Sequence, residues 1–262
     1  MSAIILESSL VHYEALGRGR PLVFLHDWLG SWRYWVPTMV ELSPSFRAYA
    51  LDFWGFGDSD KVVAWYSVGD LAGQVALFLE QMGIGRVPII GHGLGGVVGT
   101  LLAQQYPERV AQLMGVSVPL SPRQMGRTLS GYGGGENPAR VILGRRLREY
   151  EEVALEAGKT DGAAVVESVR SAREADVLGA LRALEMPVLL VSGGEDPLVA
   201  APDASILAEL DYNVYSLVLA GSGHYPMLDE GSKFCRLLRD FLAYGDAWEQ
   251  YDVKDEWKRR MR

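Results

Sequence analysis

Short apolar runs alternate with longer amphipathic stretches along most of the chain. The runs without internal alternation are Leu22–Leu25, Ala48–Leu51, Val87–Ile90, Val110–Val118, Val188–Val191 and Val214–Leu219. Helical periodicity is found in Ser67–Met82, Leu94–Tyr106, Ala204–Leu210 and Gly231–Tyr244. Strands that are apolar on both faces are typical of a parallel sheet that helices cover on both sides. The pattern therefore predicts an α/β protein with a doubly wound, mostly parallel sheet of about eight strands.

The first residues follow a different pattern. Ile4–Glu7 and Leu10–Ala15 are β-rich runs with polar and apolar alternation, and the turn Gly17-Arg18-Gly19-Arg20-Pro21 follows them. Alternation punctuated by glycine and proline is typical of antiparallel strands. We expect the sheet to begin with an antiparallel pair.

One long interval, between Val118 and Pro187, interrupts the alternation. It contains a glycine-rich piece, residues 131–135, and two charged helical stretches, Arg145–Glu156 and Ala163–Ala175. A simple crossover needs only about a dozen residues, so this interval is an insertion. We expect a core formed by residues 1–120 and 182–245, a helical cap at 121–181 with the glycine-rich piece as its mobile opening, and a tail at 246–262. The alternative is a partly disordered loop.

Composition narrows the class of partner. The 262 residues include 33 acidic and 25 basic ones, so the net charge is −8, which disfavours a nucleic-acid partner. No run approaches the ~18 apolar residues of a membrane span, and residues 1–10 do not have the pattern of a secretory signal. The single cysteine, Cys235, cannot form an internal disulfide, which fits a reducing compartment. We expect a cytoplasmic protein that acts on a small molecule.

The segment Ile89-Ile90-Gly91-His92-Gly93-Leu94-Gly95-Gly96 indicates the site of the chemistry. An apolar run passes into a tight glycine-rich turn and then into a helical pattern. Gly-x-x-x-Gly in this context matches the nucleophile elbow, Gly-x-Ser-x-Gly, in which a strained turn presents a side chain above the sheet. The helix N-terminus that follows faces developing negative charge.

Three further segments end predicted strands. Phe24–Gly30 follows the first central run, Val191–Pro197 ends a later run with an acid, and Ala220–Pro226 ends the last run with a histidine. The order elbow, acid, histidine is the triad order of one fold. Asp196 competes with Glu195 for the role of the acid.

These motifs strongly resemble those of the α/β-hydrolase superfamily, in its capped esterase and epoxide-hydrolase-like branch, over residues 10–244. The segment 51–60, Leu-Asp-Phe-Trp-Gly-Phe-Gly-Asp-Ser-Asp, is similar to the family's D-x-x-G-x-G-x-S loop. The resemblance implies that Asp196 orients His224 as a catalytic base. It also implies that the backbone amides of Trp28 and Leu94 form an oxyanion hole.

Two positions depart from the family. The elbow position that carries serine in esterases, or aspartate in epoxide hydrolases, is Gly93, which has no side chain to act as a nucleophile. The second is Asp27, where the family usually has glycine. A carboxylate that points into an oxyanion hole repels developing negative charge, so we expect Asp27 to face away into a hydrogen-bond network. For a disabled esterase, Gly93→Ser is expected to restore ester hydrolysis. For a non-covalent enzyme, the space at Gly93 could hold a water.

The remaining candidates have ordinary structural interpretations. His92 and His26 are expected to hold loops, His12 to lie at the surface, and Asp52 to fix its own loop. Ser222 lacks the geometry of a nucleophile. Trp28 and Trp54 follow strand ends and are candidates, together with Asp27, for lining an apolar substrate cleft.

Three functions remain open. The first is a serine-carboxylesterase relative for a small apolar ester-like substrate, with covalent hydrolysis disabled at Gly93. The second is a non-covalent enzyme that uses His224 and Asp196 as a general base. The third is a ligand-binding protein on the hydrolase scaffold. No metal is expected, because no histidine or cysteine pair has ligand spacing. No cofactor is expected either, because the glycine-rich turn lacks the setting of a dinucleotide site. The sequence does not indicate the oligomeric state.

Overall fold

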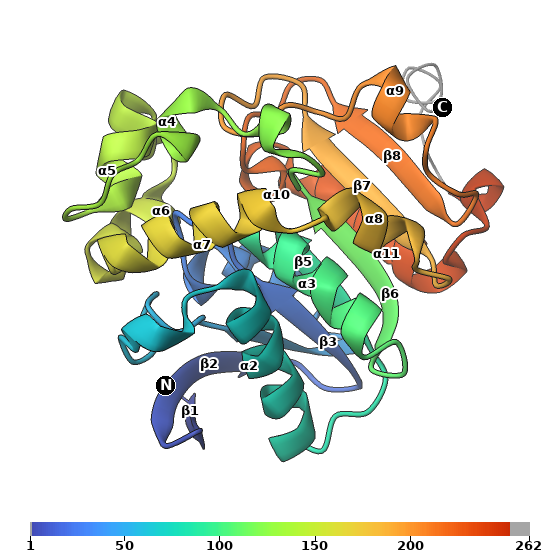
Figure 1. Ribbon diagram of the computed structural model, residues 1–262. Coiled ribbons are helices and arrows are strands. Elements are labelled where there is room, and N and C mark those ends of the chain that lie inside the picture. Colours follow the sequence, from blue (N-terminus) through green and yellow to red (C-terminus); the bar gives the residue numbers. More distant parts are fainter. Residues whose placement is uncertain (1, 252–262) are drawn as a thin grey trace.

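A single eight-stranded sheet organises the chain in the computed structural model, which describes residues 2–251 (Figure 1). The strand order is β1-β2-β4-β3-β5-β6-β7-β8. The pairs β1–β2 and β2–β4 are antiparallel, and all other neighbouring strands are parallel. The predicted doubly wound, mostly parallel sheet with an antiparallel start is confirmed. The strands are β1 Ser2–Leu6, β2 Ser9–Leu16, β3 Arg20–Leu25, β4 Phe46–Leu51, β5 Val87–His92, β6 Val110–Val116, β7 Val188–Gly193 and β8 Val214–Leu219.

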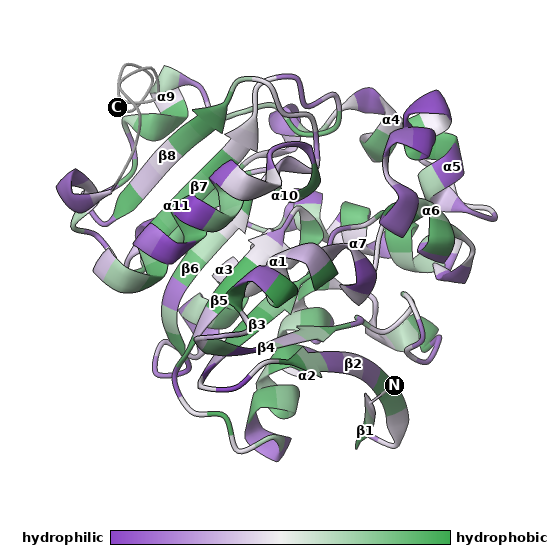
Figure 2. Cartoon of the chain, turned by 180° about the vertical axis from the view of Figure 1, so that it is seen from behind, coloured by the Kyte–Doolittle hydropathy of each residue, from purple (hydrophilic) through white to green (hydrophobic). Residues whose placement is uncertain are grey.

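Burial explains why the central strands have no polar alternation. Leu22–Leu25 of β3 and all of β7 are buried, because helices cover both faces of the sheet. Residues of β1 alternate in exposure, as expected for an edge strand with one covered face. Figure 2 shows the contrast, with hydrophobic strands in the sheet centre and both hydrophilic and hydrophobic residues along β2.

Helices α2 (Val68–Gln81), α3 (Leu94–Gln105) and α8 (Val177–Arg182) pack together on one face of the sheet, and α1 (Val36–Leu42) and α11 (Gly231–Tyr244) pack together on the other. Helix α3 lies close to the strands because its first turn is glycine-rich. A Cβ atom on Gly95 would overlap the carbonyl oxygen of Leu25. Glycine therefore lets α3 begin directly against the carboxyl end of β3.

A helical insertion separates β6 from β7. It gathers beside the sheet, and its longest helix, α7 (Gly162–Glu174), leads back to α8 (Figure 1). The division into core, cap and tail remains a prediction, and the tail beyond residue 251 lies outside the described residues. The other elements of the insertion are η3 Pro122–Gln124, α4 Arg127–Ser130, α5 Pro138–Leu143, η4 Gly144–Glu149, α6 Glu151–Glu156 and η5 Ala157–Lys159.

Short helices complete the connections: η1 Trp32–Trp35, η2 Val63–Trp65, α9 Ala204–Leu207, α10 Pro226–Asp229 and η6 Trp248–Gln250. Across residues 2–251, we find no helix with both the length and the apolar character that a membrane span requires.

Candidate active site

The tight turn between β5 and α3 is centred on Gly93, the position predicted to correspond to a nucleophile elbow. Gly93 has φ +47° and ψ −107°, a conformation that strains residues with a Cβ. Gly91 before it is equally constrained, because a Cβ there would overlap the backbone of Gly95. The predicted order of strand, tight turn and helix is therefore present.

The carboxylate of Asp27 fills the space above this turn. A Cβ atom on Gly93 would fall well inside van der Waals contact with Asp27 Oδ1. The same oxygen accepts a hydrogen bond from the amide of Leu94 (3.1 Å), which is one of the two predicted oxyanion donors. Asp27 is completely buried. The expectation that Asp27 faces away is therefore wrong. Gly93 has no side chain, so the space beside it is open, and the Asp27 carboxylate enters this space and accepts from the Leu94 amide. The carboxylate therefore lies in the space that a water was considered to occupy.

His224 lies between two carboxylates. Its Nδ1 is 2.8 Å from Asp196 Oδ2, and its Nε2 is 3.1 Å from Asp27 Oδ2. Asp196 is held in place by the amides of Leu198 (2.8 Å) and Val199 (3.0 Å), which donate to its other oxygen. The structure thus brings together the histidine and the acid that the resemblance implied. The neighbouring candidate acid, Glu195, is exposed.

The charges of this group favour a protonated histidine. Burial alone lowers the pKa of His224, but the charges of Asp196 and Asp27 outweigh burial and raise it to about 10. Burial likewise opposes ionisation of Asp27, yet His224 brings its pKa down to about 2. At neutral pH the imidazolium therefore donates both N–H groups, and neither ring nitrogen is free to accept a proton.

A chain of hydrogen bonds behind the site holds Asp27 and His224 in place. The Asp27 amide donates to the Tyr34 hydroxyl (2.8 Å), so that hydroxyl donates its own proton to His92 Nδ1 (3.0 Å). His92 Nε2–H in turn donates to the carbonyl oxygen of His224 (2.8 Å). Burial, and then the charge of His224, lowers the pKa of His92 to about 4, so its ring is neutral as this order requires. No sequence signal marks Tyr34, which lies in a run of aromatic residues.

His26 and His12 also occupy buried positions. His26 Nε2 accepts from the amide of Phe53 (3.0 Å), so Nδ1–H donates to the carbonyl oxygen of Asp27 (2.8 Å). His12 was expected at the surface, which is wrong: it is buried, with Nδ1 2.9 Å from the Asp52 carboxylate. Asp52 also accepts from the amide of Trp32 (2.8 Å), so its carboxylate joins β2, the segment after β3 and its own loop.

The tryptophans proposed to line a substrate cleft are buried. Trp28 is completely buried, and Trp54 stacks at a tilt on Trp65 with ring centroids 4.7 Å apart. The indole N–H groups of Trp28 and Trp54 have no hydrogen-bond partner among the described residues. Their role in substrate binding remains a prediction. Ser222 is buried and donates to Glu230, away from the elbow.

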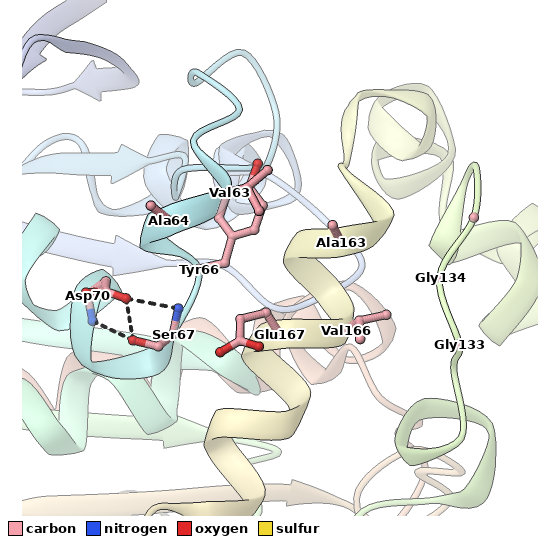
Figure 3. Close-up of a pocket in the computed structure, with 11 residues that line it drawn as sticks. Val63, Ala64, Tyr66, Ser67, Asp70, Gly133, Gly134, Ala163, Val166 and Glu167 are labelled. Carbon is pink, nitrogen blue, oxygen red and sulfur yellow. Dashed lines mark hydrogen bonds between the residues drawn. The ribbon is translucent and has the colours of Figure 1, made fainter.

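A cavity of about 500 Å³ lies at the glycine-rich piece of the insertion, between α7 and the start of α2 (Figure 3). Its wall includes Tyr66, Glu167 and the capping pair Ser67 and Asp70, whose hydrogen bonds Figure 3 marks. Asp27, Gly93, Asp196 and His224 do not line this cavity or the four other surface hollows described for residues 2–251. The buried charged group is therefore separate from these openings.

One group of residues has the composition of a metal site. Single ligand atoms of His12, Asp52 and Asp58 lie within 4.8 Å of one another, an arrangement that sequence spacing did not indicate. Asp52 is already engaged by backbone amides, and Asp58 pairs with Lys159 (2.9 Å). Since protein donors already satisfy these oxygens, we assign no metal to the group.

The fold and the site define a class of protein. The family profile of the alpha/beta hydrolase fold matches residues 20–139. Together with the strand order and the turn at Gly93, this match shows that the chain has the α/β-hydrolase fold.

Known proteins similar over nearly the whole chain are esterases, hydrolases and lactonases of this fold. The chain is 26% identical to the pimeloyl-[acyl-carrier protein] methyl ester esterase of Vibrio campbellii, covering 90% of this chain and 100% of that protein. It is 26% identical to the 2-hydroxymuconate semialdehyde hydrolase of Pseudomonas sp. strain CF600, covering 88% and 89%.

Two solved structures illustrate the likeness of fold. The structure of E-2-(acetamidomethylene)succinate hydrolase has a TM-score of 0.80 at 22% identity and covers 92% of this chain and 98% of its own. A serine-to-glycine mutant of an N-acyl homoserine lactonase, complexed with N-hexanoyl homoserine lactone, has a TM-score of 0.80 at 20% identity and covers 92% and 96%.

Proposed function

We propose that this chain is an esterase-related α/β-hydrolase-fold protein in which covalent ester hydrolysis is disabled, and whose scaffold retains a small ester-like molecule without turning it over. The observation that carries the proposal is the Asp27 carboxylate, which lies on the amide of Leu94 and on His224 Nε2 in the space that a nucleophile and its oxyanion would need.

Three requirements of acyl-enzyme chemistry are unmet in this arrangement. Gly93 offers no attacking atom, an anion already occupies the amide of Leu94, and His224 is protonated. Loss of the serine alone lowers turnover about 10⁶-fold in one serine protease and leaves roughly 10³–10⁴-fold over water. The filled oxyanion hole removes the main source of that residual rate.

The same geometry disfavours the non-covalent alternative. A general base must have a free lone pair within reach of the proton that it abstracts. Both ring nitrogens of His224 are committed to carboxylates, so Asp27 would have to leave before the histidine could act.

Ligand retention has one supporting precedent among similar folds. The lactonase mutant with glycine in place of serine is a complex with N-hexanoyl homoserine lactone. In the present chain a ligand beside Gly93 would have to displace Asp27, or bind outside the buried group.

The test compares four proteins: the unsubstituted chain, Gly93→Ser, Asp27→Gly and the double variant Asp27→Gly/Gly93→Ser. The expectation that Gly93→Ser alone restores hydrolysis is revised, because the new Cβ would overlap Asp27 Oδ1. We expect only the double variant to hydrolyse a short aryl ester, with a gain of about 10³-fold or more.

Adding His224→Gln to the double variant is the matched control, and it should abolish the gain. Circular dichroism establishes that each variant is folded. The proposal is wrong if the unsubstituted chain already hydrolyses the ester at a rate that His224→Gln removes. It is equally wrong if the folded double variant gains nothing.

A further inference from the structure

A hollow on the insertion is lined by three arginines and lies apart from the buried charged group. It has a volume of about 430 Å³, and its wall is formed by Arg140, Gly144, Arg145, Leu147, Arg148 and Ala154. These residues come from α5, η4 and α6, which lie together in Figure 1. The three arginines are exposed, so their charged ends are accessible to a solute.

The backbone of η4 explains why two of the arginines act together. A 3₁₀ helix has three residues per turn, so residues i and i+3 lie one above the other. Arg145 and Arg148 therefore project from the same side of η4, while Arg146 lies toward the loop that carries His224, with Nη1 near Gly223. Arg140, near the end of α5, supplies the third charge.

The hollow carries an excess of positive charge, because it is lined by three arginines and, among the described residues, by no acidic one. The chain has a net charge of −8, and arginines elsewhere, such as Arg33, Arg170 and Arg239, pair with carboxylates. Within residues 2–251, no ion pair joins the three arginines of the hollow to an acid. Glu149, Glu151 and Glu152 follow closely in sequence, but none of them lines the hollow.

Like charges stacked one turn apart destabilise each other, and an anion between them removes this repulsion. Guanidinium groups bind phosphate through two parallel hydrogen bonds, and a phosphate monoester carries about −1.5 to −2 charges at neutral pH. Leu147 and Ala154 give the same hollow an apolar part that suits an organic substituent.

We propose that the hollow formed by Arg140, Arg145 and Arg148 is a binding site for a small phosphorylated molecule. The site does not depend on whether hydrolysis is disabled, because it shares no residue with the group around His224. A polyanionic macromolecule would use the same charges, but the hollow also has a largely apolar lining, which favours a small ligand that carries an organic substituent.

The test is calorimetric titration of the full chain with pyrophosphate, hexyl phosphate and inorganic phosphate at low and at physiological ionic strength. We expect binding that weakens with salt, and tighter binding of hexyl phosphate than of inorganic phosphate because of the apolar wall. Arg145→Gln/Arg148→Gln should weaken pyrophosphate binding at least tenfold.

Arg18→Gln/Arg123→Gln is the matched control, since it removes the same two charges from exposed arginines outside the hollow. This control variant should bind pyrophosphate with an affinity within about twofold of that of the unsubstituted chain. Equal losses in the two double variants would overturn the proposal, because they would indicate a general charge effect. Binding of heparin without binding of pyrophosphate would overturn it in favour of a macromolecular polyanion.

Discussion

At the scale of single residues, the position of one carboxylate decides the state of the site. Asp27 accepts hydrogen bonds from the amide of Leu94 and from His224, so its two oxygens contact the predicted oxyanion donor and the predicted catalytic base. The free energy of this arrangement comes from charge pairing inside a dry site, where an unpaired charge is unfavourable. His224 is thereby stabilised in the form that cannot accept a proton.

Asp27→Asn tests this pairing with little change in shape. The amide keeps an oxygen for Leu94 N–H and offers its nitrogen as a donor to a neutral His224. Because burial lowers the pKa of His224 and Asp27 opposes that effect, the pKa should fall from about 10 by at least one unit. Nuclear magnetic resonance titration of the histidine ring measures it. Asp203→Asn, an exposed change, is the control, and an unchanged pKa in Asp27→Asn would contradict the assignment.

At the scale of elements, ion pairs join the insertion to the segments that follow β3 and β4. Glu156 at the end of α6 is buried and receives Arg33 Nε at 2.6 Å and Lys159 Nζ at 2.9 Å. Lys159 also reaches Asp58, and the amide of Asp161 donates to the carbonyl oxygen of Gly55 (2.8 Å). The loop similar to D-x-x-G-x-G-x-S therefore serves as the attachment point of the insertion.

Glu156→Gln should destabilise the protein by about 1–2 kcal/mol. The value lies below that of a fully buried pair because Arg33 and Lys159 are partly exposed. Urea denaturation measures the change. The matched control is Glu209→Gln, which breaks an exposed pair with Arg182 (3.4 Å) and should change stability by less than about 0.5 kcal/mol. Equal effects of the two substitutions would show that Glu156 does not fasten the insertion.

The sequence was sufficient for elements with strong periodicity and for motifs at strand ends. The central strands, α2, α3 and α11 follow their patterns closely because apolar burial determines them. Two results depend instead on tertiary contacts. The stretch Arg145–Glu156, predicted as one helix, is divided between η4 and α6. The short helix α1 was not predicted, because the aromatic residues before it obscure the helical periodicity. The orientation of Asp27 could not be predicted, because it depends on the space beside a residue distant in sequence.

At the scale of the whole molecule, the buried histidines give stability a maximum in pH. The raised pKa of His224 adds stability that is complete below its unfolded value of about 6.5 and is lost as pH rises toward about 10. The lowered pKa of His92 acts in the opposite sense, because stability grows as pH rises from about 4 to about 6.5. The lowered pKa of Asp27 adds a further loss of folding stability as the pH falls below about 4.

Stability should therefore be greatest near pH 6.5 and decline on both sides, by at most about 1.4 kcal/mol per pH unit for each proton. Denaturant unfolding between pH 3 and pH 10 tests this expectation. His224→Gln should remove most of the alkaline decline. It should also reduce the acidic decline, because His224 lowers the pKa of Asp27 and contributes to lowering that of His92, and the part that comes from burial of His92 should remain. An alkaline limb that persists in this variant would show that another group controls it.

The overlap between residues 27 and 93 also restricts the order in which substitutions can be introduced. Asp27 and a serine at residue 93 compete for one volume, so a chain that holds both must push one of them out of place. A stepwise conversion between this chain and a serine-bearing one therefore passes through glycine at both positions. A library that varies residue 93 alone would place every new side chain against Asp27, so the two codons are best randomised together.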